Sequence, residues 1–473
     1  MSRSHAAAAA LAALCDRLPA DALRDAEDRH REEPRRLLRG AGTVVALPRD
    51  VDEVAAILRA CHEARLPVIP YGGGTGLVGG QVSPDEGALI LSLERMTAIR
   101  EIRPEEGVMI AEAGAVLADV QAAAERADRL FPLSLASEGS ARLGGLLGAN
   151  AGGVNVLRYG TMRELTLGVE AVLPDGSVLR RLSRLRKDNT GYDLRHLLVG
   201  AEGTLGVITA AALRLFPRPA QRGAMTLALP GPEAALPLLW LARERLGETV
   251  SAFELISGVG LAMVAARLPE VRQPLAGPPA WSALVDVGLP EGPPAAERLA
   301  DLAAEAFERG LATDGVVAQS EAQRAEFWRL REAIPEANRL TGAVASHDVA
   351  VPLGEIPALI ERGTALVEAM GPLRVNAFGH VGDGNLHFNV FPREGVAREA
   401  VRALRAPVTR AVHDLVHALG GTISAEHGIG RLKADELERY ADPAKIAALR
   451  AIKAALDPHG IMNPGAVLAA EPA

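Results

Sequence analysis

The chain has 473 residues, of which 48% are hydrophobic and 23% charged, with a formal net charge of −8. This length predicts two or three domains, and the composition is that of a globular protein. An acidic chain with 3% aromatic residues and no basic run excludes a dedicated nucleic-acid-binding module. No apolar run approaches the ~20 residues of a membrane span.

Residues 1–40 are expected to form a charged helical segment that ends at Gly40. Its Ala-rich start imitates a short lipoprotein signal, but the bulky Leu14 precedes Cys15 where a small residue would be needed. We therefore interpret the run as helix. Cys15 and Cys61 are far apart in the sequence, which favours incidental thiols in a reducing compartment. The expected location is the cytoplasm, with peripheral membrane attachment left open.

A mixed α+β domain is expected over residues 41–217, with many glycines. It begins with a strand over 43–48 and a helix over 50–66, for which Asp50 is a candidate N-cap. Short strands flank a glycine-rich loop at 71–80. Further along, alternating apolar residues on both sides of Asp175-Gly176 predict a hairpin over 167–180.

A second domain is expected over residues 218–425, after a boundary in the Pro-containing stretch 217–225. Its pattern predicts an antiparallel sheet with helices on one face, a long amphipathic helix over 294–311 and a loop over 273–279. Residues 426–473 are expected to form a C-terminal segment, helical over 434–457.

The loop "YGGGTGLVGG" at 71–80 contains a match to the dinucleotide-binding pattern G-x-G-x-x-G. That pattern works only when a helix opens inside the loop, because the helix N-terminus holds the diphosphate. Here Pro84 and Asp85 follow, and the next strand begins near Ala88, which leaves no room for the helix. Two interpretations remain: a nest of backbone N–H groups for an anion, or a glycine-rich surface turn.

The stretch "NAFGHVGDGNLHFNVF" at 376–391 predicts a strand, a turn and a second strand. Such a hairpin can bring His380 and His387 together, and the later "ISAEHGIG" supplies Glu426 and His427. Two imidazoles and a carboxylate suit a divalent cation such as Zn²⁺ or Mn²⁺. The alternative is that the two histidines are structural.

Two further side chains are candidates for binding a small acidic substrate. Arg331 stands just before a helix end expected at Pro335, where it is either a carboxylate-binding cation or a solvated helix residue. Asn389 is two residues past His387, so both point to the same side of a strand.

Four segments in the same order resemble a known family: "GGGTGLVGG", "GANAGGVNVLRYG", "NTGYDLRHLLVGAEGTLGVIT" and "AFGHVGDGNLHFNV". They are similar to the FAD-linked D-2-hydroxyacid dehydrogenases, which include flavoprotein D-lactate dehydrogenase, D-2-hydroxyglutarate dehydrogenase and the glycolate oxidase D subunit. The resemblance spans about Ala46 to Ala466. It implies an α+β fold of the vanillyl-alcohol oxidase type: a two-subdomain FAD-binding domain, a substrate or cap domain, and a C-terminal segment that returns to the flavin.

The resemblance also implies the residues that bind FAD. The diphosphate would lie on Gly72, Gly73, Gly74, Thr75 and Gly76. The flavin and ribityl region would be lined by Ser137, Glu138, Gly139, Ser140, Gly144, Gly145, Asn150 and Gly153. Gly203 and Ile208 would lie by the adenosine half, and Asn463 would approach the flavin ring.

Two departures from the family pattern affect the FAD site. Thr75 stands where covalent relatives often carry a flavin-linking histidine, so noncovalent FAD is expected. Arg142-Leu143 replaces a Thr-Ile pair, and Arg142 is expected to face either a phosphate or solvent.

The family uses the positions of His380, His387 and Glu426 as metal ligands and the position of His427 as the acid–base residue. Arg331 and Asn389 would bind the substrate. Many relatives carry a lysine at the position of Ser346, and in some of them it contacts a distal substrate carboxylate. The absence of this lysine weakens the case for a dicarboxylate substrate without excluding one.

The expected function is oxidation of a D-2-hydroxy acid (D-lactate, D-2-hydroxyglutarate or glycolate class) to the 2-oxo acid, with hydride transfer to flavin N5. The expected partners are this substrate and an electron acceptor, such as a quinone, a cytochrome or an electron-transfer flavoprotein; a homodimer stays open. Two alternatives remain: an FAD-binding subunit of a glycolate oxidase-like complex, and a non-redox flavoenzyme like alkyl-dihydroxyacetone-phosphate synthase.

Overall fold

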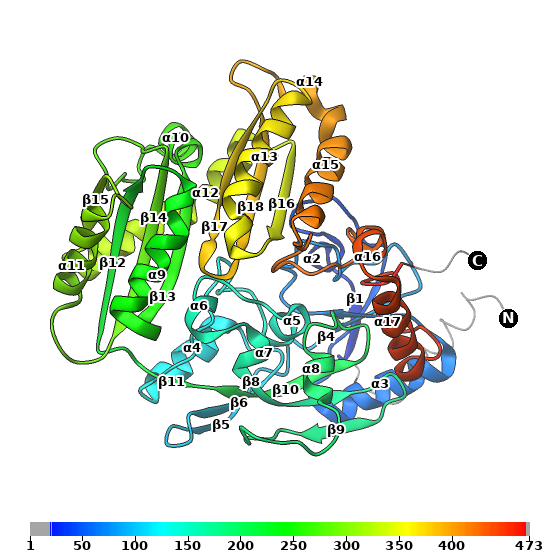
Figure 1. The fold of residues 1–473 in the computed structure, drawn as a ribbon. Coiled ribbons are helices and arrows are strands. Elements are labelled where there is room, and N and C mark those ends of the chain that lie inside the picture. The colour runs from blue at the N-terminus through cyan, green and yellow to red at the C-terminus, as the bar shows by residue number, and fades with distance from the viewer. Residues whose placement is uncertain (1–18, 20, 470–473) are drawn as a thin grey trace. The chain divides into compact units, whose positions relative to one another are not determined.

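The computed structural model describes residue 19 and residues 21–469, and the chain divides into two units (Figure 1). Unit 1 comprises residues up to 153 together with 160–218 and 426–473. Unit 2 comprises residues 154–159 and 219–425. Unit 1 is thus built from three separate stretches of sequence, the last of which is the C-terminal segment.

The expected helix over residues 1–40 is wrong over residues 21–40; its first 18 residues lie outside the described part of the chain. A strand, β1 (Leu23–Asp25), and one helical turn, α2 (Asp28–Arg31), occupy this stretch. β1 pairs antiparallel with β2 (Val44–Ala46). The reason is tertiary: strand pairing satisfies the backbone, and this outweighs the helix propensity of the charged residues.

The first sheet of unit 1 has the order β1-β2-β4-β3, with β3 at Val68–Tyr71 and β4 at Leu89–Ser92. β4 pairs parallel with both β2 and β3. Helix α3 (Val51–Ala64) connects β2 to β3, and the Asp50 side chain caps it as expected by accepting the N–H groups of Asp52 and Glu53. No helix intervenes between β3 and β4 in this described stretch, so the Rossmann interpretation is excluded.

The second sheet of unit 1 is antiparallel, in the order β5-β6-β10-β8-β9. Its strands are β5 (Ile99–Arg103), β6 (Val108–Glu112), β8 (Thr166–Val172), β9 (Val178–Arg181) and β10 (Val207–Arg214). β8 and β9 form the predicted hairpin. A small pair joins β7 (Arg129–Leu130) to β11 (Phe216–Pro217).

Short helices complete unit 1. They are α4 (Leu117–Arg126), α5 (Leu143–Ala149), α7 (Met162–Leu165), α8 (Leu194–Leu198), α16 (Ala434–Tyr440) and α17 (Pro443–Leu456). The helix expected over 434–457 is therefore two helices. The break comes where Asp442 caps α17 by accepting the N–H of Ala444, with Pro443 at the first position of the new helix.

Unit 2 is built on a seven-stranded sheet in the order β15-β12-β14-β13-β17-β18-β16, in which all pairs are antiparallel. The strands are β12 (Gln221–Leu229), β13 (Val250–Ser257), β14 (Trp281–Leu289), β15 (Asp314–Val317), β16 (Ala345–Ala350), β17 (Leu373–His380) and β18 (Asn385–Pro392). The predicted hairpin over 376–391 is confirmed as β17 and β18.

The helices of unit 2 are α6 (Val156–Tyr159), α9 (Ala235–Leu246), α10 (Gly258–Arg267), α11 (Ala295–Glu308), α12 (Glu321–Thr341), α13 (Ile356–Ala369), α14 (Arg398–Val401) and α15 (Arg405–Ala418). A 3-10 turn, η4 (Val381–Asp383), links β17 to β18.

The helices of unit 2 cover both faces of the sheet, so the expectation of helices on one face is wrong. One face packs against α9, α11, α13 and α15 in a large apolar core. The other packs against α10 and α12 in a second core that includes Ile256, Leu284 and Phe378. The physical reason is the sequence of the strands: every residue of β13, and every residue of β14 after Trp281, is buried. A strand buried on both sides needs two covering layers.

Helix α12 also corrects an expectation, because it continues through Pro335 to Thr341. A proline inside a helix lacks the N–H that would bond the carbonyl four residues earlier, which here belongs to Arg331. Burial of Ile334, Ala337 and Asn338 against the sheet offsets that lost bond. The result is a helix that holds Arg331 in its middle.

Candidate functional site

The first glycine loop of unit 1, residues 71–80, follows β3. It lies directly against a second glycine-rich segment, residues 137–153. A Cβ added at Gly73 would stand 2.1 Å from the carbonyl oxygen of Ser140, and one added at Gly72 would stand 3.0 Å from the Cα of Gly145. Backbone therefore touches backbone between the two loops, which only glycine permits. The structure brings these four predicted residues together.

A cavity of about 270 Å³ opens beside this contact. It is lined by Arg29, Tyr71, Gly72, Gly73, Val116, Gly139, Ser140 and Arg142. A methyl group at Gly139 would meet nothing within 4 Å, so this wall is open backbone. Glycine backbone beside two guanidinium groups fits the diphosphate of a dinucleotide.

Arg142 lines this cavity rather than facing away from it, and its guanidinium also donates to the carbonyl of Gly114. Arg29 is held by Glu94, to which its two Nη atoms donate at 2.8 and 3.1 Å. Sequence reasoning gave no role to Tyr71, the first residue of the loop at 71–80, and missed Arg29 and Val116. Arg29 and Val116 come from distant segments without a local motif, so only the tertiary fold brings them to this cavity.

Several other predicted FAD residues have structural contacts of their own. The Asn150 Oδ1 accepts the Thr161 hydroxyl at 2.9 Å and the Arg163 N–H at 2.8 Å. The Glu138 Oε1 accepts the Ser134 hydroxyl at 2.5 Å. These contacts alone explain the two polar side chains, so their contact with a flavin stays a prediction.

The remaining predicted FAD positions are distributed over both sheets of unit 1 and the segments next to them. Gly203 packs against Pro70 of β3, the Gly76 carbonyl accepts Gln81 Nε2 at 2.7 Å, and Ile208 is a buried residue of β10. Gly74, Thr75, Ser137 and Gly153 lie in loops, and Gly144 lies in helix α5. For all of them, the structure gives the location while the contact with FAD stays a prediction.

Asn463 ties the C-terminal segment to the first glycine loop. Its Nδ2 donates to the carbonyls of Gly80 (3.0 Å) and Glu202 (2.9 Å), and its Oδ1 accepts from Arg431 at 2.8 Å. The Glu202 carboxylate accepts the N–H groups of Ile429 (2.7 Å) and Gly430 (2.8 Å). Burial raises the pKa of Glu202 and lowers the pKa of Arg431 to about 10.

The register of the unit 2 sheet places the second set of candidates on one face. His380 ends β17 opposite Glu254 of β13. On the other side of β17, His387 of β18 stands between Phe378 and Asp348. Because alternate residues of a strand share a face, these five side chains lie on the face that α12 covers.

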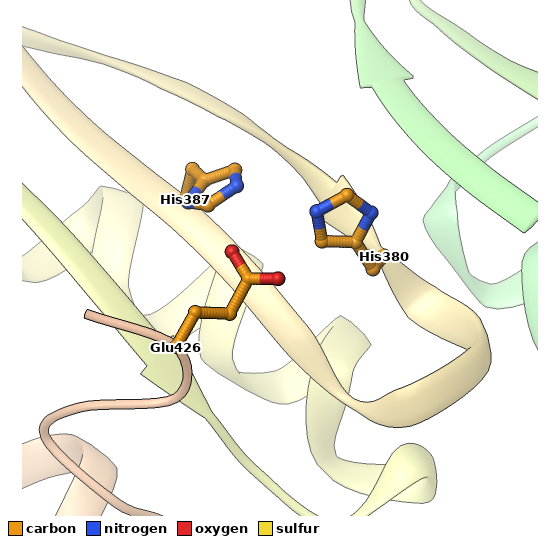
Figure 2. Close-up of side chains that lie close together, drawn as sticks. All are labelled: His380, His387 and Glu426. Atoms are coloured by element: carbon orange, nitrogen blue, oxygen red, sulfur yellow. The ribbon is translucent and has the colours of Figure 1, made fainter. Parts of the chain in front are cut away.

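His380, His387 and Glu426 each offer one ligand atom, and these atoms lie within 4.8 Å of one another. Figure 2 shows the two imidazoles, from adjacent strands, and the carboxylate directed into a common space. The loop that carries Glu426 starts at Ala425, whose N–H donates to the carbonyl of Asp348 of β16 at 3.3 Å. Two nitrogens and one oxygen at this spacing fit a tetrahedral or five-coordinate divalent cation with positions left for a substrate.

Glu254 connects this group to Arg331. Its carboxylate accepts Arg331 Nε at 2.6 Å through one oxygen and His380 Nδ1 through the other. Both Glu254 and Arg331 are buried, so the alternative of a solvated Arg331 is excluded. Burial raises the pKa of Glu254, but the charges of Arg331 and His380 outweigh burial and lower it to about 2.

The other two predicted residues lie nearby. Asn389 stands between Asn376 and Ser346 in the sheet, on the same face as His387. His427, next to Glu426, offers a ring nitrogen within 4.8 Å of carboxylate oxygens of Glu426 and Asp348. A base beside a candidate metal and two carboxylates is placed for proton transfer.

Sequence reasoning did not identify Glu254 or the position of Asp348 beside His387. One signal could have indicated Glu254: it is a single carboxylate in "VSAFELIS", a strand whose eight residues are all buried. A charge in a buried strand is nearly always paired. Its partners are 77 and 126 residues away, and nothing local specifies them.

No helix within the described residues is long and apolar enough to cross a membrane.

Comparison with known proteins identifies two domains in the chain. A family model described as "FAD binding domain" matches residues 42–181, and one described as "FAD linked oxidases, C-terminal domain" matches residues 218–467. The structure of p-cresol methylhydroxylase with substrate bound superposes with a TM-score of 0.76 at 16% identity, covering 98% of this chain and 97% of that one. This likeness shows the fold, which is of the vanillyl-alcohol oxidase type. Fold and matched domains define an FAD-linked oxidoreductase.

Two curated relatives narrow the class. The mitochondrial D-2-hydroxyglutarate dehydrogenase of Bos taurus is 38% identical over 431 residues, which cover 91% of this chain and 77% of that protein. The D-2-hydroxyglutarate dehydrogenase of Stutzerimonas stutzeri is 35% identical over 437 residues, covering 91% and 92%. The chain belongs to the FAD-linked D-2-hydroxyacid dehydrogenase family.

Proposed function

We propose that this chain oxidises a D-2-hydroxy acid to the 2-oxo acid with noncovalent FAD, a divalent cation held by His380, His387 and Glu426, and His427 as the base. The observation that carries the proposal is the convergence of two imidazoles and a carboxylate within 4.8 Å, on the sheet face where Arg331 is buried. The relatives named D-2-hydroxyglutarate dehydrogenases make D-2-hydroxyglutarate the first substrate to test.

The side chains divide the reaction between them. Arg331 pairs with the substrate carboxylate through its Nη groups, because its Nε is already engaged by Glu254. His427 takes the hydroxyl proton, and Asn389 donates a hydrogen bond that orients the substrate. When bound, the cation lowers the pKa of the substrate hydroxyl and FAD accepts the α-hydrogen as hydride.

The size of the substrate is the least constrained part of the proposal. Ser346 is exposed on β16 and pairs with Asn389 in the sheet, so it offers a hydroxyl where a second carboxylate would favour a cation. A short monocarboxylate such as D-lactate is therefore the direct competitor of D-2-hydroxyglutarate. The cation is proposed to be Zn²⁺ or Mn²⁺, and the electron acceptor a quinone, a cytochrome or an electron-transfer flavoprotein.

Anaerobic reduction of the bound flavin tests the reaction. We expect a D-2-hydroxy acid to bleach the visible flavin absorbance of the isolated chain in a stopped-flow experiment, and the L enantiomer to leave it unchanged. Comparing D-2-hydroxyglutarate with D-lactate ranks the two substrate classes. Absence of bleaching by every member of a D-2-hydroxy-acid panel would refute the proposal.

Metal content tests the histidine group separately. His380→Ala should remove the bound cation and slow flavin reduction by about 100-fold or more, which is the scale of a Lewis-acid contribution of several kcal/mol. The matched control is His417→Ala, an exposed histidine of α15, which should keep both. Equal metal content in the two variants would rule out the proposed ligands.

A further inference from the structure

Glu254 is a buried carboxylate with two functional neighbours and no exposed surface. One oxygen accepts Arg331 Nε at 2.6 Å and the other accepts His380 Nδ1. Both partners belong to unit 2, as does Glu254 itself, and each comes from a different element: β13, α12 and β17. The Glu254 side chain thus connects Arg331, the proposed substrate-binding arginine, to His380, a proposed metal ligand.

The hydrogen bond to His380 fixes which ring nitrogen can coordinate. An ionised carboxylate only accepts hydrogen bonds, so Nδ1 must carry the proton. The other nitrogen, Nε2, is then the one that presents a lone pair to a cation. A carboxylate behind a metal-binding imidazole also restrains the ring and raises its basicity.

The hydrogen bond to Arg331 fixes the orientation of the guanidinium. With Nε held by Glu254, the planar group lies with its Cζ 4.7 Å from the centre of the Phe378 ring. Phe378 is two residues before His380 on the same strand, and its ring centroid lies 5.0 Å from that of His387. The guanidinium and the two imidazoles are therefore held in one packed cluster.

A second buried carboxylate of the same sheet shows what a purely structural pair looks like. Asp286 of β14 is also buried; its carboxylate forms an ion pair with Arg324 Nε at 2.7 Å and accepts a hydrogen bond from Trp328 Nε1 at 2.7 Å. Neither partner is a histidine or belongs to the candidate site. Glu254 and Asp286 are both buried and both paired with an arginine. They differ in the second partner, which is His380 for Glu254 and Trp328 for Asp286. Asp286 is therefore a matched control.

Resting on the proposed function, we propose that Glu254 is a positioning residue that holds His380 in the Nδ1–H tautomer for metal binding and Arg331 in register with it. Replacing one carboxylate oxygen by an amide group would place N–H against N–H at one of the two partners. Either His380 must then change tautomer or move, or Arg331 must move.

The test compares Glu254→Gln with Asp286→Asn and His380→Ala in the full chain. Zn²⁺ affinity is measured on metal-stripped protein by competition with a chromogenic chelator. Loss of an outer-shell carboxylate typically lowers metal affinity 10- to 100-fold, and we expect that loss in Glu254→Gln. Asp286→Asn should keep wild-type affinity. Glu254→Gln should also raise KM for the 2-hydroxy acid, because Arg331 loses its anchor.

The outcomes separate the inference from the proposed function. If His380→Ala loses Zn²⁺ and Glu254→Gln keeps wild-type affinity, the positioning role is wrong while the metal site stands. If both variants keep the affinity, the metal site and the inference fail together. An equal loss in Asp286→Asn would mark the effect as general destabilisation and would also overturn the inference.

A measurement on the wild-type chain covers the case in which Glu254→Gln fails to fold. Nitrogen-15 NMR of histidine side chains distinguishes the two neutral tautomers, and His380→Ala assigns the signal. We expect His380 of the metal-stripped protein to be protonated at Nδ1. The Nε2–H tautomer would contradict the proposal.

Discussion

At the scale of single residues, Gly73 has the least room for a side chain among the glycines that line the cavity beside the first glycine loop. The carbonyl of Ser140 occupies the space a side chain would need, only 2.1 Å from an ideal Cβ. Gly148, in helix α5 of the same loop region, meets only Cα of Glu202 at 3.9 Å, an ordinary contact. The pair separates the effect of crowding from the effect of losing a glycine.

Gly73→Ala should push the two glycine loops apart. We expect a loss of about 1–3 kcal/mol in stability, the usual scale of overpacking, and a weaker affinity for FAD measured by titration of the apoprotein. Gly148→Ala should be neutral or stabilising by up to about 1 kcal/mol, because alanine favours a helix interior. Equal FAD affinity in Gly73→Ala and wild type would show that the contact between the loops does not shape the site.

At the scale of elements, the local ones were predictable and the non-local ones were not. The hairpin of β17 and β18 was predictable because strand alternation and the turn residues around Gly384 are encoded in 16 consecutive residues. The cap of α3 by Asp50 was likewise local. The hairpin pattern gave the grouping of His380 with His387.

The pairing of Glu254 with His380 was not predictable, because it depends on β13 lying beside β17, and no local signal specifies that strand order. The continuation of α12 through Pro335 was missed for a related reason. Local propensity favours a stop at proline, while burial of the following turn against the sheet favours the helix and is visible only in the fold.

The stability of the contact between the Glu202 carboxylate and the C-terminal segment depends on pH. Burial raises the pKa of Glu202 above its usual value of 4.5. The folded state then holds the proton more tightly than the unfolded state, so this contribution to stability is complete below about pH 4.5 and is lost as pH rises through the raised pKa. Glu202→Gln does not titrate, and its amide nitrogen faces the N–H of Ile429 or Gly430, so it is a pH-independent reference of lower stability.

We expect the stability advantage of wild type over Glu202→Gln to be largest below about pH 4.5 and to shrink as pH rises through the raised pKa. All three tryptophans lie in unit 2, so tryptophan fluorescence does not report on unit 1. Unfolding of unit 1 in urea is instead monitored by the flavin fluorescence, which recovers when the flavin is released. A difference in stability that stays constant with pH would contradict the raised pKa.

At the scale of the whole molecule, the chain leaves unit 1, builds unit 2 and returns. Residues 426–473 follow unit 2 in the sequence but belong to unit 1, together with residues up to 153 and residues 160–218. Asn463 bonds the carbonyl of Gly80, and Arg431 donates to the carbonyls of Gly79 and Gly80. The end of the first glycine loop is therefore held by residues more than 350 positions later.

Hydrogen exchange can show that the returning segment responds to FAD as part of unit 1. A ligand present at 100 times its Kd stabilises the unit that binds it by about 2.7 kcal/mol, which slows exchange through unfolding of that unit by about 100-fold. We expect amides of α16 and α17 to gain this protection together with those of β3 and β4. Helices α9 and α11 of unit 2 serve as the internal reference and should change far less. Exchange of residues 434–456 at the rate of the apoprotein, while β3 and β4 become protected, would show that the C-terminal segment unfolds independently of the dinucleotide site.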